Sequence, residues 1–176
     1  MPRDPLADPK PLVRRVYAYV AYRIGDGFDA QDVTSETFAR AVRYRSTFDP
    51  EQGEPIAWLL GIARRCIANA HAVGAKEVEL FDQVAAPGEL EAESIERLDL
   101  RRAVLALDPR ARELIALRYG ADLKARQIAE LLGERTNTVE VALHRALDQL
   151  RMQLEPEEKP GRLRARKPSK PRHTTS

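Results

Sequence analysis

The chain has 176 residues, which is enough for one medium-sized domain or two small ones. Aromatic residues make up 6% of the composition and helix-favouring residues are common, so the composition predicts an all-helical protein. The positive charge is concentrated at the C-terminus: residues 159–176 carry seven basic side chains and no acid, so the total of +2 leaves residues 1–158 at −5. This distribution excludes a uniformly basic protein.

Targeting and redox features predict a cytoplasmic protein. Cys66 has no second cysteine to pair with, which excludes an internal disulfide and fits a reducing compartment. Its apolar surroundings favour a buried thiol over a nucleophile. The N-terminus lacks the apolar segment of a signal peptide, and no apolar run approaches the length needed to cross a membrane.

The sequence contains no candidate for catalytic chemistry. A glycine-rich phosphate loop, a metal-ligand cluster and a catalytic triad are all missing, and His71, His144 and His173 are scattered singly. We therefore expect a protein that is not an enzyme and that needs neither a metal nor a cofactor.

The first predicted helix covers residues 11–24, after a loose, proline-rich lead-in at residues 1–9. Gly25, Asp26 and Gly27 end this helix. Its expected core positions are Leu12, Val16 and either Tyr19 or Val20.

A second helix is predicted over residues 30–44, with Asp29 as its N-cap. Its expected core positions are Val33, Thr37, Phe38 and either Ala41 or Val42. The other face carries acids followed by bases at helical spacing: Asp32, Glu36, Arg40 and Arg43. Taken alone, this pattern favours an ordinary solvated helix face.

A turn-rich connection at residues 46–54 precedes a third helix, which Pro55 opens and Gly74 ends. Its expected inward stripe is Ile56, Leu59, Ala63, Cys66 or Ile67, and Ala70. A polar strip runs beside it, formed by Arg64, Arg65 and Asn69. Three helices of this size predict one small core.

Residues 75–94 are acidic, contain a Pro-Gly pair and show no long apolar period, which predicts a flexible linker. The chain is therefore expected to form two domains, at residues 10–74 and 95–154. Residues 155–176 are proline-rich and charged, with too little apolar surface to fold, and predict a disordered basic tail.

The second domain is expected to contain four helices. The first starts near Ile95 and stops before Asp108, which caps the next helix; Pro109 opens that helix and Gly120 follows its end. The inward positions of the second of these helices are Leu114, Ile115 and Leu117.

Residues 123–154 show two apolar-periodic segments separated by a short turn at Gly133, which is the pattern of a helix-turn-helix. Gly133 suits a left-handed backbone, and the last helix is expected to begin near Thr136. Its inward stripe is Val139, Leu143, Leu147 and Leu150. The positions left facing outward are Asn137, Glu140, Val141, His144, Arg145 and Asp148. Such a helix reads the major groove of DNA in many proteins, although the same helix pair also occurs as plain scaffold.

Taken together, these parts resemble the small two-domain sigma factors of bacterial RNA polymerase, the extracytoplasmic-function (ECF) class of the sigma-70 family. The likeness is carried by DAQDVTSETFARAV (29–42), AWLLGIARRCIANA (57–70) and LDPRARELIALRYGADLKARQIAELLGERTNTVEVALHRALDQLR (107–151). Each motif alone is weak, but their order and separation are specific. The resemblance covers nearly all of residues 10–154 and implies a region 2-like domain and a region 4-like domain.

The resemblance implies two roles for the first domain. Its second helix would dock on the beta-prime clamp of core polymerase through Asp32, Glu36, Phe38, Arg40 and Arg43. The loop at residues 48–54, with Phe48 and Asp49, would capture a base extruded from the minus-ten element. The side chains that would meet the nontemplate strand are Arg64, Arg65 and Asn69. Trp58 is expected to pack in the core rather than stack on a base.

For the second domain the resemblance implies recognition of the minus-thirty-five element. The contact candidates are Arg135, Thr136, Asn137, Thr138, Glu140, Val141, His144 and Arg145. Many relatives have Lys-Ser-Arg where this chain has Glu140, Val141 and Ala142, so fewer phosphate contacts are expected. Glu140 could instead accept a hydrogen bond from a cytosine amino group, and Val141 could touch a thymine methyl group.

The leading hypothesis is a sigma factor that binds core polymerase, through its beta-prime clamp and beta flap, and promoter DNA. By resemblance, an anti-sigma factor could hold the chain inactive. One alternative is a stand-alone helix-turn-helix regulator, which leaves the acidic face of the first domain unexplained. A second alternative is a helical adaptor protein in which the helix-turn-helix is only scaffold.

Overall fold

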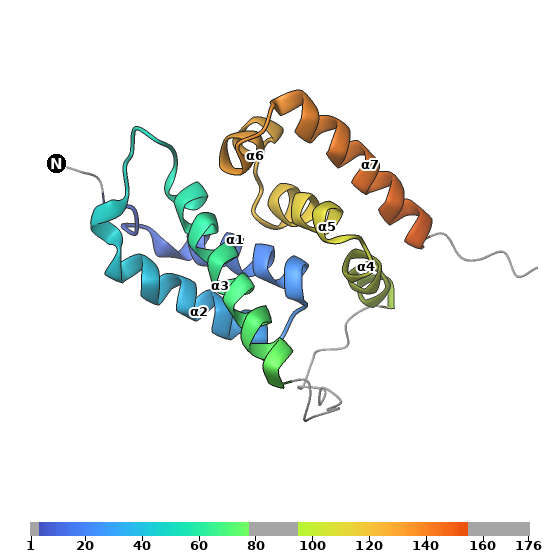
Figure 1. Ribbon diagram of the computed structural model, residues 1–176, viewed down its shortest axis with the longest axis horizontal. Helices are drawn as coiled ribbons and strands as arrows, with labels where there is room; N and C mark the ends of the chain where they lie inside the picture. The colour runs from blue at the N-terminus through green and yellow to red at the C-terminus, as the bar shows by residue number, and fades with distance from the viewer. Residues whose placement is uncertain (1–3, 78–94, 155–176) are drawn as a thin grey trace, which may run out of the picture.

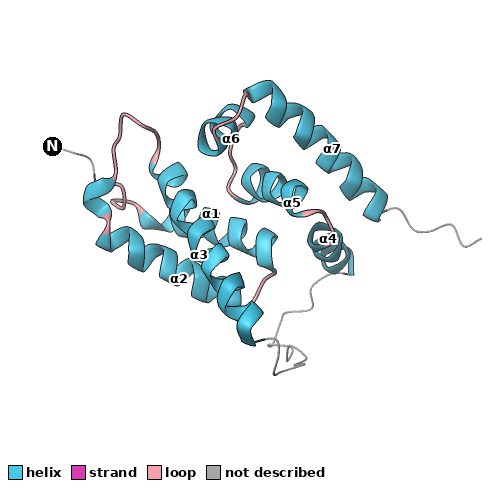
Figure 2. Ribbon diagram, in the orientation of Figure 1, coloured by secondary structure: helices cyan, strands magenta, loops and turns pink. Residues whose placement is uncertain are grey.

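The structure is a computed structural model that describes residues 4–77 and 95–154, with side chains for residues 4–70 and 97–154. The described residues form seven α-helices joined by turns, and no strand occurs among them (Figures 1 and 2). The prediction of an all-α protein with two helical domains is confirmed. The predicted linker and the predicted basic tail lie outside the described residues, apart from the start of the linker.

The first domain is built from three helices. They are α1 (Pro9–Ile24), α2 (Phe28–Arg43) and α3 (Pro55–Glu77), with the 3-10 turn η1 (Arg45–Thr47) after α2. Each of the three α-helices contacts the other two, so they enclose one core. This arrangement agrees with the predicted three-helix domain.

The second domain contains four α-helices and one π-helical turn. They are α4 (Ile95–Leu105), α5 (Pro109–Ile115), the π-turn η2 (Ala116–Gly120), α6 (Ala125–Leu132) and α7 (Thr136–Leu154). The last two form the helix-turn-helix, and α7 packs on α5 as well as on α6. The four predicted helices are therefore present.

Three helix ends differ from the prediction. The first helix begins at Pro9 rather than at residue 11, and α2 begins at Phe28, with Gly27 and not Asp29 at the N-cap. Gly27 has φ 123° and ψ −156°, a backbone conformation that glycine adopts far more readily than other residues. Asp29 lies in the first turn instead, where it still faces the positive end of the helix dipole.

The third helix does not end at Gly74 but continues to Glu77. A glycine inside a helix costs only about 1 kcal/mol relative to alanine, which does not by itself stop a helix. The predicted inward stripe holds from Ile56 to Ile67, but Ala70 is exposed. The packed part of α3 is therefore shorter than the helix.

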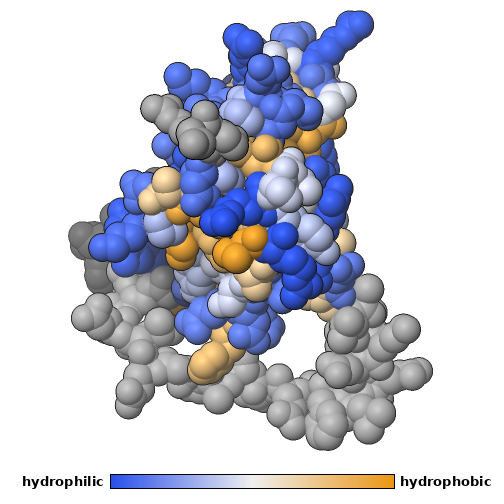
Figure 3. Space-filling view, turned by 90° about the vertical axis from the view of Figure 1, so that its left-hand side faces the viewer, coloured by the Kyte–Doolittle hydropathy of each residue, from blue (hydrophilic) through white to orange (hydrophobic). Residues whose placement is uncertain are grey.

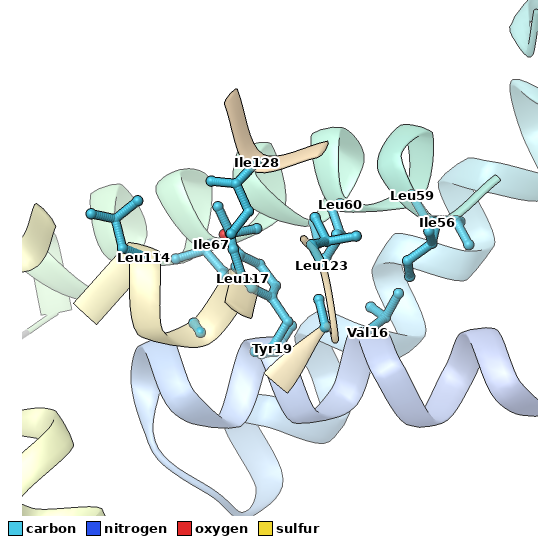
Figure 4. Packing of buried hydrophobic residues seen from close by; sticks show 14 of the residues in the cluster. Val16, Tyr19, Ile56, Leu59, Leu60, Ile67, Leu114, Leu117, Leu123 and Ile128 are labelled. Atoms are coloured by element: carbon cyan, nitrogen blue, oxygen red, sulfur yellow. The ribbon is translucent and has the colours of Figure 1, made fainter. Parts of the chain in front are cut away.

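The two domains pack directly against each other and share one hydrophobic core. Figure 4 shows side chains of α1 and α3 pointing toward side chains from residues 114–128. Tyr19 and Leu117 lie on opposite sides of this contact, and both are fully buried. Fully burying one such large apolar side chain contributes on the order of 1.5–3 kcal/mol, so the contact between the domains is substantial.

Gly120 marks a close backbone approach between the two domains. A Cβ atom at this position would lie 2.9 Å from the Tyr19 Cα, so only glycine lets η2 reach the α1 backbone. Arg15 of α1 secures the same contact, because its Nε donates to the Ala121 carbonyl at 2.7 Å and its Nη2 to the Asp122 carbonyl at 3.2 Å.

A second, smaller core lies within the second domain. It joins α4, α5 and α7 through Val104, Leu107, Ala111, Ile115 and Ala146. The smaller core packs α7 against α4 and α5, and Tyr22 of α1 in the first domain also packs against it. Among the described helices, none is both long and apolar enough to cross a membrane.

Candidate nucleic-acid and polymerase surfaces

One side of α2 is buried and the other is open to solvent. Val33 and Ala41 face the core, as do Thr34 and Thr37, whose hydroxyls donate to backbone carbonyls one turn earlier at 2.7 Å. Both buried threonine hydroxyls therefore have a hydrogen-bond partner, as buried polar groups usually do. The outward side is left for charged residues.

The residues predicted to meet polymerase divide between the two sides of α2. Asp32, Glu36 and Arg43 are exposed, and Arg40 is half-buried with its Nε 2.6 Å from the Glu36 Oε1. Phe38 instead packs against the core. Four of the five predicted residues therefore lie where a partner could reach their charged groups.

The outward side of α2 also carries apolar side chains that the sequence reasoning missed. Phe28 is 79% exposed and Val42 is 62% exposed, at opposite ends of the helix. Phe28 lies one turn before Asp32, on the same side of the helix. Helical spacing had left Ala41 and Val42 as alternative core positions, and the structure buries Ala41 and exposes Val42.

The loop between α2 and α3 borders a groove of about 580 Å³, which also reaches α6. Phe48 and Trp58 form its aromatic wall, with ring centroids 5.6 Å apart and ring planes at 61°. Trp58 packs partly against the core, as predicted, but it also lines the groove, which was not predicted. This loop lies at the left of Figure 1, and that side of the molecule shows small apolar areas among hydrophilic ones (Figure 3).

Asp49 shapes this loop through its own carboxylate. Its Oδ1 accepts from the Glu51 N–H at 3.0 Å, and its Oδ2 accepts from the Gln52 side chain at 2.9 Å. At the edge of the groove, the Gln127 amide of α6 donates to Glu54 at 3.3 Å. The groove thus has walls from both domains.

Two of the three residues in the predicted polar strip on α3 are exposed to solvent. Arg65 and Asn69 are exposed, so the strip is not enclosed in the core. Arg64 is 40% exposed, and its Nε lies 3.2 Å from the Glu113 Oε1 of α5. Arg65 and Asn69 therefore lie at the surface, whereas Arg64 forms an ion pair with the second domain.

Glu113 is the centre of a polar cluster between the domains, formed with Tyr19, Arg23 and Arg64. Glu113 is only 7% exposed. Its Oε1 accepts from the Tyr19 hydroxyl at 3.0 Å, and Arg23 pairs with its other oxygen while donating to the Tyr19 hydroxyl at 3.1 Å. Burial raises the pKa of Tyr19, so this hydroxyl keeps its proton and remains a donor.

Sequence reasoning missed this Glu113 cluster. Its members come from three helices that are far apart in the chain, and Glu113 stands beside the apolar positions Leu114 and Ile115 without a periodic signal of its own. The position of this carboxylate beside buried apolar residues was the only feature of the sequence that suggested its burial.

The helix-turn-helix has the predicted turn. Gly133 adopts φ 69°, the left-handed conformation expected of it, and the Glu134 N–H donates to the Ala129 carbonyl at 2.9 Å. Arg110 of α5 donates to both Glu134 carboxylate oxygens, at 2.5 and 2.6 Å. The turn is thereby fixed to the helix beneath it.

The recognition helix α7 presents the predicted residues to solvent. Val139 and Leu143 face the core, as expected, together with Ala146. All eight contact candidates are exposed: Arg135, Thr136, Asn137, Thr138, Glu140, Val141, His144 and Arg145. Asp148 lies 3.7 Å from His144 and 3.1 Å from Arg151, so part of the charge on this face is paired.

No group of three or more potential metal-ligating side chains occurs in the part of the chain that the structure describes. Cys66 is buried at 4% exposure, in agreement with a plain core thiol.

Two sequence models of a single family match the chain in order. Sigma-70 region 2 matches residues 10–74, and Sigma-70, region 4 matches residues 97–150. The first match includes α2, the loop and most of α3, and the second includes the helix-turn-helix. The family resemblance drawn from the motifs is therefore confirmed.

The chain is also similar in sequence to individual ECF sigma factors. The chain is 31% identical over 168 residues to the ECF RNA polymerase sigma factor SigD of Mycobacterium tuberculosis, covering 85% of this chain and 74% of SigD. It is 31% identical over 145 residues to the ECF RNA polymerase sigma factor BldN of Streptomyces coelicolor, covering 75% of this chain. The chain spans only about half of the length of BldN, 53%.

Solved structures show the same fold. The sigma factor RpoE of Bartonella quintana, in complex with the anti-sigma factor NepR, matches with a TM-score of 0.68 and 20% identity, covering 83% of this chain and 93% of RpoE. CnrH, in complex with the cytosolic domain of CnrY, matches with a TM-score of 0.55 and 22% identity, covering 83% of this chain and 81% of CnrH. Because both region models match and SigD is 31% identical over 74% of its own length, the chain belongs to the ECF class of the sigma-70 family of RNA polymerase sigma factors.

Proposed function

We propose that this chain binds core RNA polymerase, directs it to a subset of promoters and opens the DNA at the start site. The observation that carries the proposal is the presence of region 2 and region 4 in one chain, each with most of its expected contact residues at the surface. We further propose that the protein acts in the cytoplasm as a binding subunit rather than as an enzyme.

The exposed side of α2 is proposed to dock on the polymerase beta-prime clamp. Asp32 and Glu36 offer acidic groups, Arg40 and Arg43 offer basic groups, and Phe28 supplies an apolar contact beside them. Interfaces commonly combine a few apolar anchors with a charged rim, which matches this composition. The beta flap is the proposed contact of the second domain.

The groove beside the loop is proposed to receive a base from the minus-ten element. Opening DNA costs a few kcal/mol for each displaced base, so a site must recover that energy by stacking and by charge. Phe48 and Trp58 form an aromatic wall, and the groove volume of about 580 Å³ falls in the usual range for ligand sites. Arg65 and Asn69 are proposed to contact the nontemplate strand beyond it.

Helix α7 is proposed to read the minus-thirty-five element in the major groove. Glu140 and Val141 are exposed on its reading face. A carboxylate accepts from a cytosine amino group and an apolar side chain contacts a thymine methyl group, so these residues favour C and T in the element. Arg135 and Arg145 are proposed to reach phosphates.

An anti-sigma factor is proposed as a further partner. RpoE of Bartonella quintana, which has the same fold, was solved with the anti-sigma factor NepR. The α2 face and the recognition helix of this chain are both exposed, so an inhibitor that covered them would block both proposed contacts.

Transcription from genomic DNA fragments by core polymerase of the same organism, with and without the chain, tests the proposed function. We expect a defined set of transcripts that requires the chain. A mobility-shift assay with the same DNA and the chain alone should show only weak binding. Strong sequence-specific binding without polymerase, and no new transcripts with it, would instead establish a stand-alone regulator.

A further inference from the structure

The first domain contains a set of three converging donors, of which only Arg64 has been given an expected role so far. The Tyr19 hydroxyl and the Arg23 and Arg64 guanidinium groups all point at the Glu113 carboxylate. Tyr19 and Arg23 come from α1 and Arg64 comes from α3, so the donors belong to one domain and the acceptor to the other. We call the three donors the Arg23 site.

The chemistry of the Arg23 site is that of an oxyanion receptor. Guanidinium groups bind carboxylates and phosphates through the same directed N–H donors, and a hydroxyl adds a third hydrogen bond. Two cations face a single carboxylate, so the site keeps an excess of positive charge even when Glu113 fills it. The Arg23 and Glu113 side chains are 20% and 9% exposed, which limits screening by solvent.

Glu113 cannot stay in this site when both domains act on one promoter. Elements at minus ten and minus thirty-five lie about 25 base pairs apart, roughly 85 Å along B-form DNA. A compact body of about 150 residues has a radius of gyration of only about 15 Å, too small to reach both. The packed arrangement, with η2 against α1, must therefore open on the promoter.

Opening would expose two neighbouring surfaces of the first domain at once. Helix α6 lines the groove beside the loop, and its Gln127 is hydrogen bonded to Glu54, so removal of the second domain uncovers the groove. The same movement withdraws Glu113 from the Arg23 site. The two surfaces are linked through α3, which carries Trp58 near one of them and Arg64 at the other.

We propose that the Arg23 site binds a phosphate of single-stranded promoter DNA, and that Glu113 occupies it in the closed chain as an internal substitute for that phosphate. This inference rests on the proposed function, and it adds Tyr19 and Arg23 to the DNA contacts. It also makes the closed chain self-inhibited, because Glu113 and DNA compete for the same donors.

The test uses the full chain and a fluorescein-labelled single-stranded dT12 oligonucleotide as the phosphate probe. Glu113→Gln removes the competing charge while keeping the shape of the side chain. We expect a larger radius of gyration by small-angle scattering and tighter dT12 binding by anisotropy, by about fivefold or more, the lower end of typical coupling between linked equilibria. Asp99→Asn is the matched control, because it removes one exposed acid of the same domain, paired with Arg102, and should change neither quantity.

A second substitution opens the chain without touching the charges. Gly120→Ala places a methyl group 2.9 Å from the Tyr19 backbone, so it should separate η2 from α1 and also strengthen dT12 binding. If neither Glu113→Gln nor Gly120→Ala expands the chain, the proposed role of Glu113 in closure is wrong.

Arg23→Ala, added to whichever variant opens, tests the site itself. We expect dT12 affinity to fall and the slope of log affinity against log salt to decrease in magnitude by about 0.7 for the lost phosphate contact. An opened chain whose affinity and slope are unchanged by Arg23→Ala would overturn the phosphate site.

The transcription assay with wild-type chain separates the two proposals. If transcripts depend on the chain but the dT12 experiments give a negative result, the proposed phosphate binding at the Arg23 site is wrong and the proposed function is retained. Absence of such transcripts would remove the proposed function itself.

Discussion

Glu36 lies on the exposed side of α2 and pairs with Arg40 one turn further along. Such exposed helical pairs contribute less than about 1 kcal/mol to folding. Glu36→Lys should therefore weaken binding to core polymerase, because it reverses a charge on the proposed docking surface, while leaving thermal unfolding nearly unchanged. Binding is measured by anisotropy with labelled chain, and folding by circular dichroism.

The matched control for Glu36→Lys is Glu130→Lys, which breaks an equivalent exposed pair with Arg126 on α6. It should leave polymerase binding through α2 intact. Unfolding of the Glu36→Lys variant, or equal loss of polymerase binding in both variants, would contradict the assignment of the α2 surface.

Leu143 and Val141 are two positions apart on α7 and face opposite ways. Leu143 is 8% exposed and Val141 is 45% exposed. Leu143→Ala should cost roughly 2–5 kcal/mol of unfolding free energy in a denaturant titration, because it leaves a cavity. Val141→Ala should stay within about 0.5 kcal/mol of the wild type, and should instead change which promoters are transcribed. A fully stable Leu143→Ala variant would reverse the face assignment.

Single residues also show what a sequence can and cannot predict. The inward position of Leu143 followed from helical spacing, which depends only on near neighbours in the chain. The burial of Glu113 did not follow, because its partners Tyr19 and Arg64 are supplied by another domain. Local sequence patterns predict which face of a helix is apolar. They do not predict that a polar residue beside that face, such as Glu113, is buried by a distant part of the chain.

Asp108 is the N-cap residue of α5. The Asp108 carboxylate accepts from the backbone N–H groups of Arg110 and Ala111 at 3.0 and 2.9 Å. Replacement by alanine should cost about 0.5–2 kcal/mol of unfolding free energy at pH 7.

The same cap predicts a pH dependence. The hydrogen bond from the Ala111 backbone is the largest cause that lowers the pKa of Asp108 below its usual value. A carboxylate with a lowered folded-state pKa stabilises the fold above its unfolded pKa of about 3.9, and this contribution is lost as the pH falls through the folded pKa. The difference between wild type and Asp108→Ala should therefore shrink in urea titrations from pH 7 to below pH 4. Asp108→Asn, a neutral cap, should lack this dependence, and a constant difference for alanine would contradict the role of the carboxylate.

Capping at Asp108 and the turn at Gly133 were predictable because proline or glycine fixes the local backbone there. The start of α2 was predicted wrongly, because both Gly27 and Asp29 are acceptable cap residues, and Gly27 takes a positive φ of 123° that suits glycine at the turn into the helix. The end of α3 was wrong for a similar reason, since the glycine at position 74 carries only a small helix penalty. Element boundaries depend on such small energies, while element identity does not.

At the scale of the whole molecule, the sequence predicted two tethered helical domains but not their shared core. The linker composition indicates that the domains can separate, and nothing in the spacing of Tyr19 or Gly120 indicates that they meet. The observed contact joins α1 to η2 through a glycine that has no room for a side chain. The chain therefore has a compact form in which α6 of the second domain lines the groove beside the loop of the first domain.

A footprint on one chain-dependent promoter is the decisive test of whether the chain reads two promoter elements as part of polymerase. Holoenzyme with wild-type chain should protect two regions about 25 base pairs apart and make thymines of the minus-ten region reactive to permanganate. With Arg65→Glu, which changes an exposed residue of α3, the upstream protection should remain while permanganate reactivity is lost. The account would be contradicted if the chain alone protected both regions without polymerase, or if Arg65→Glu left strand opening unchanged.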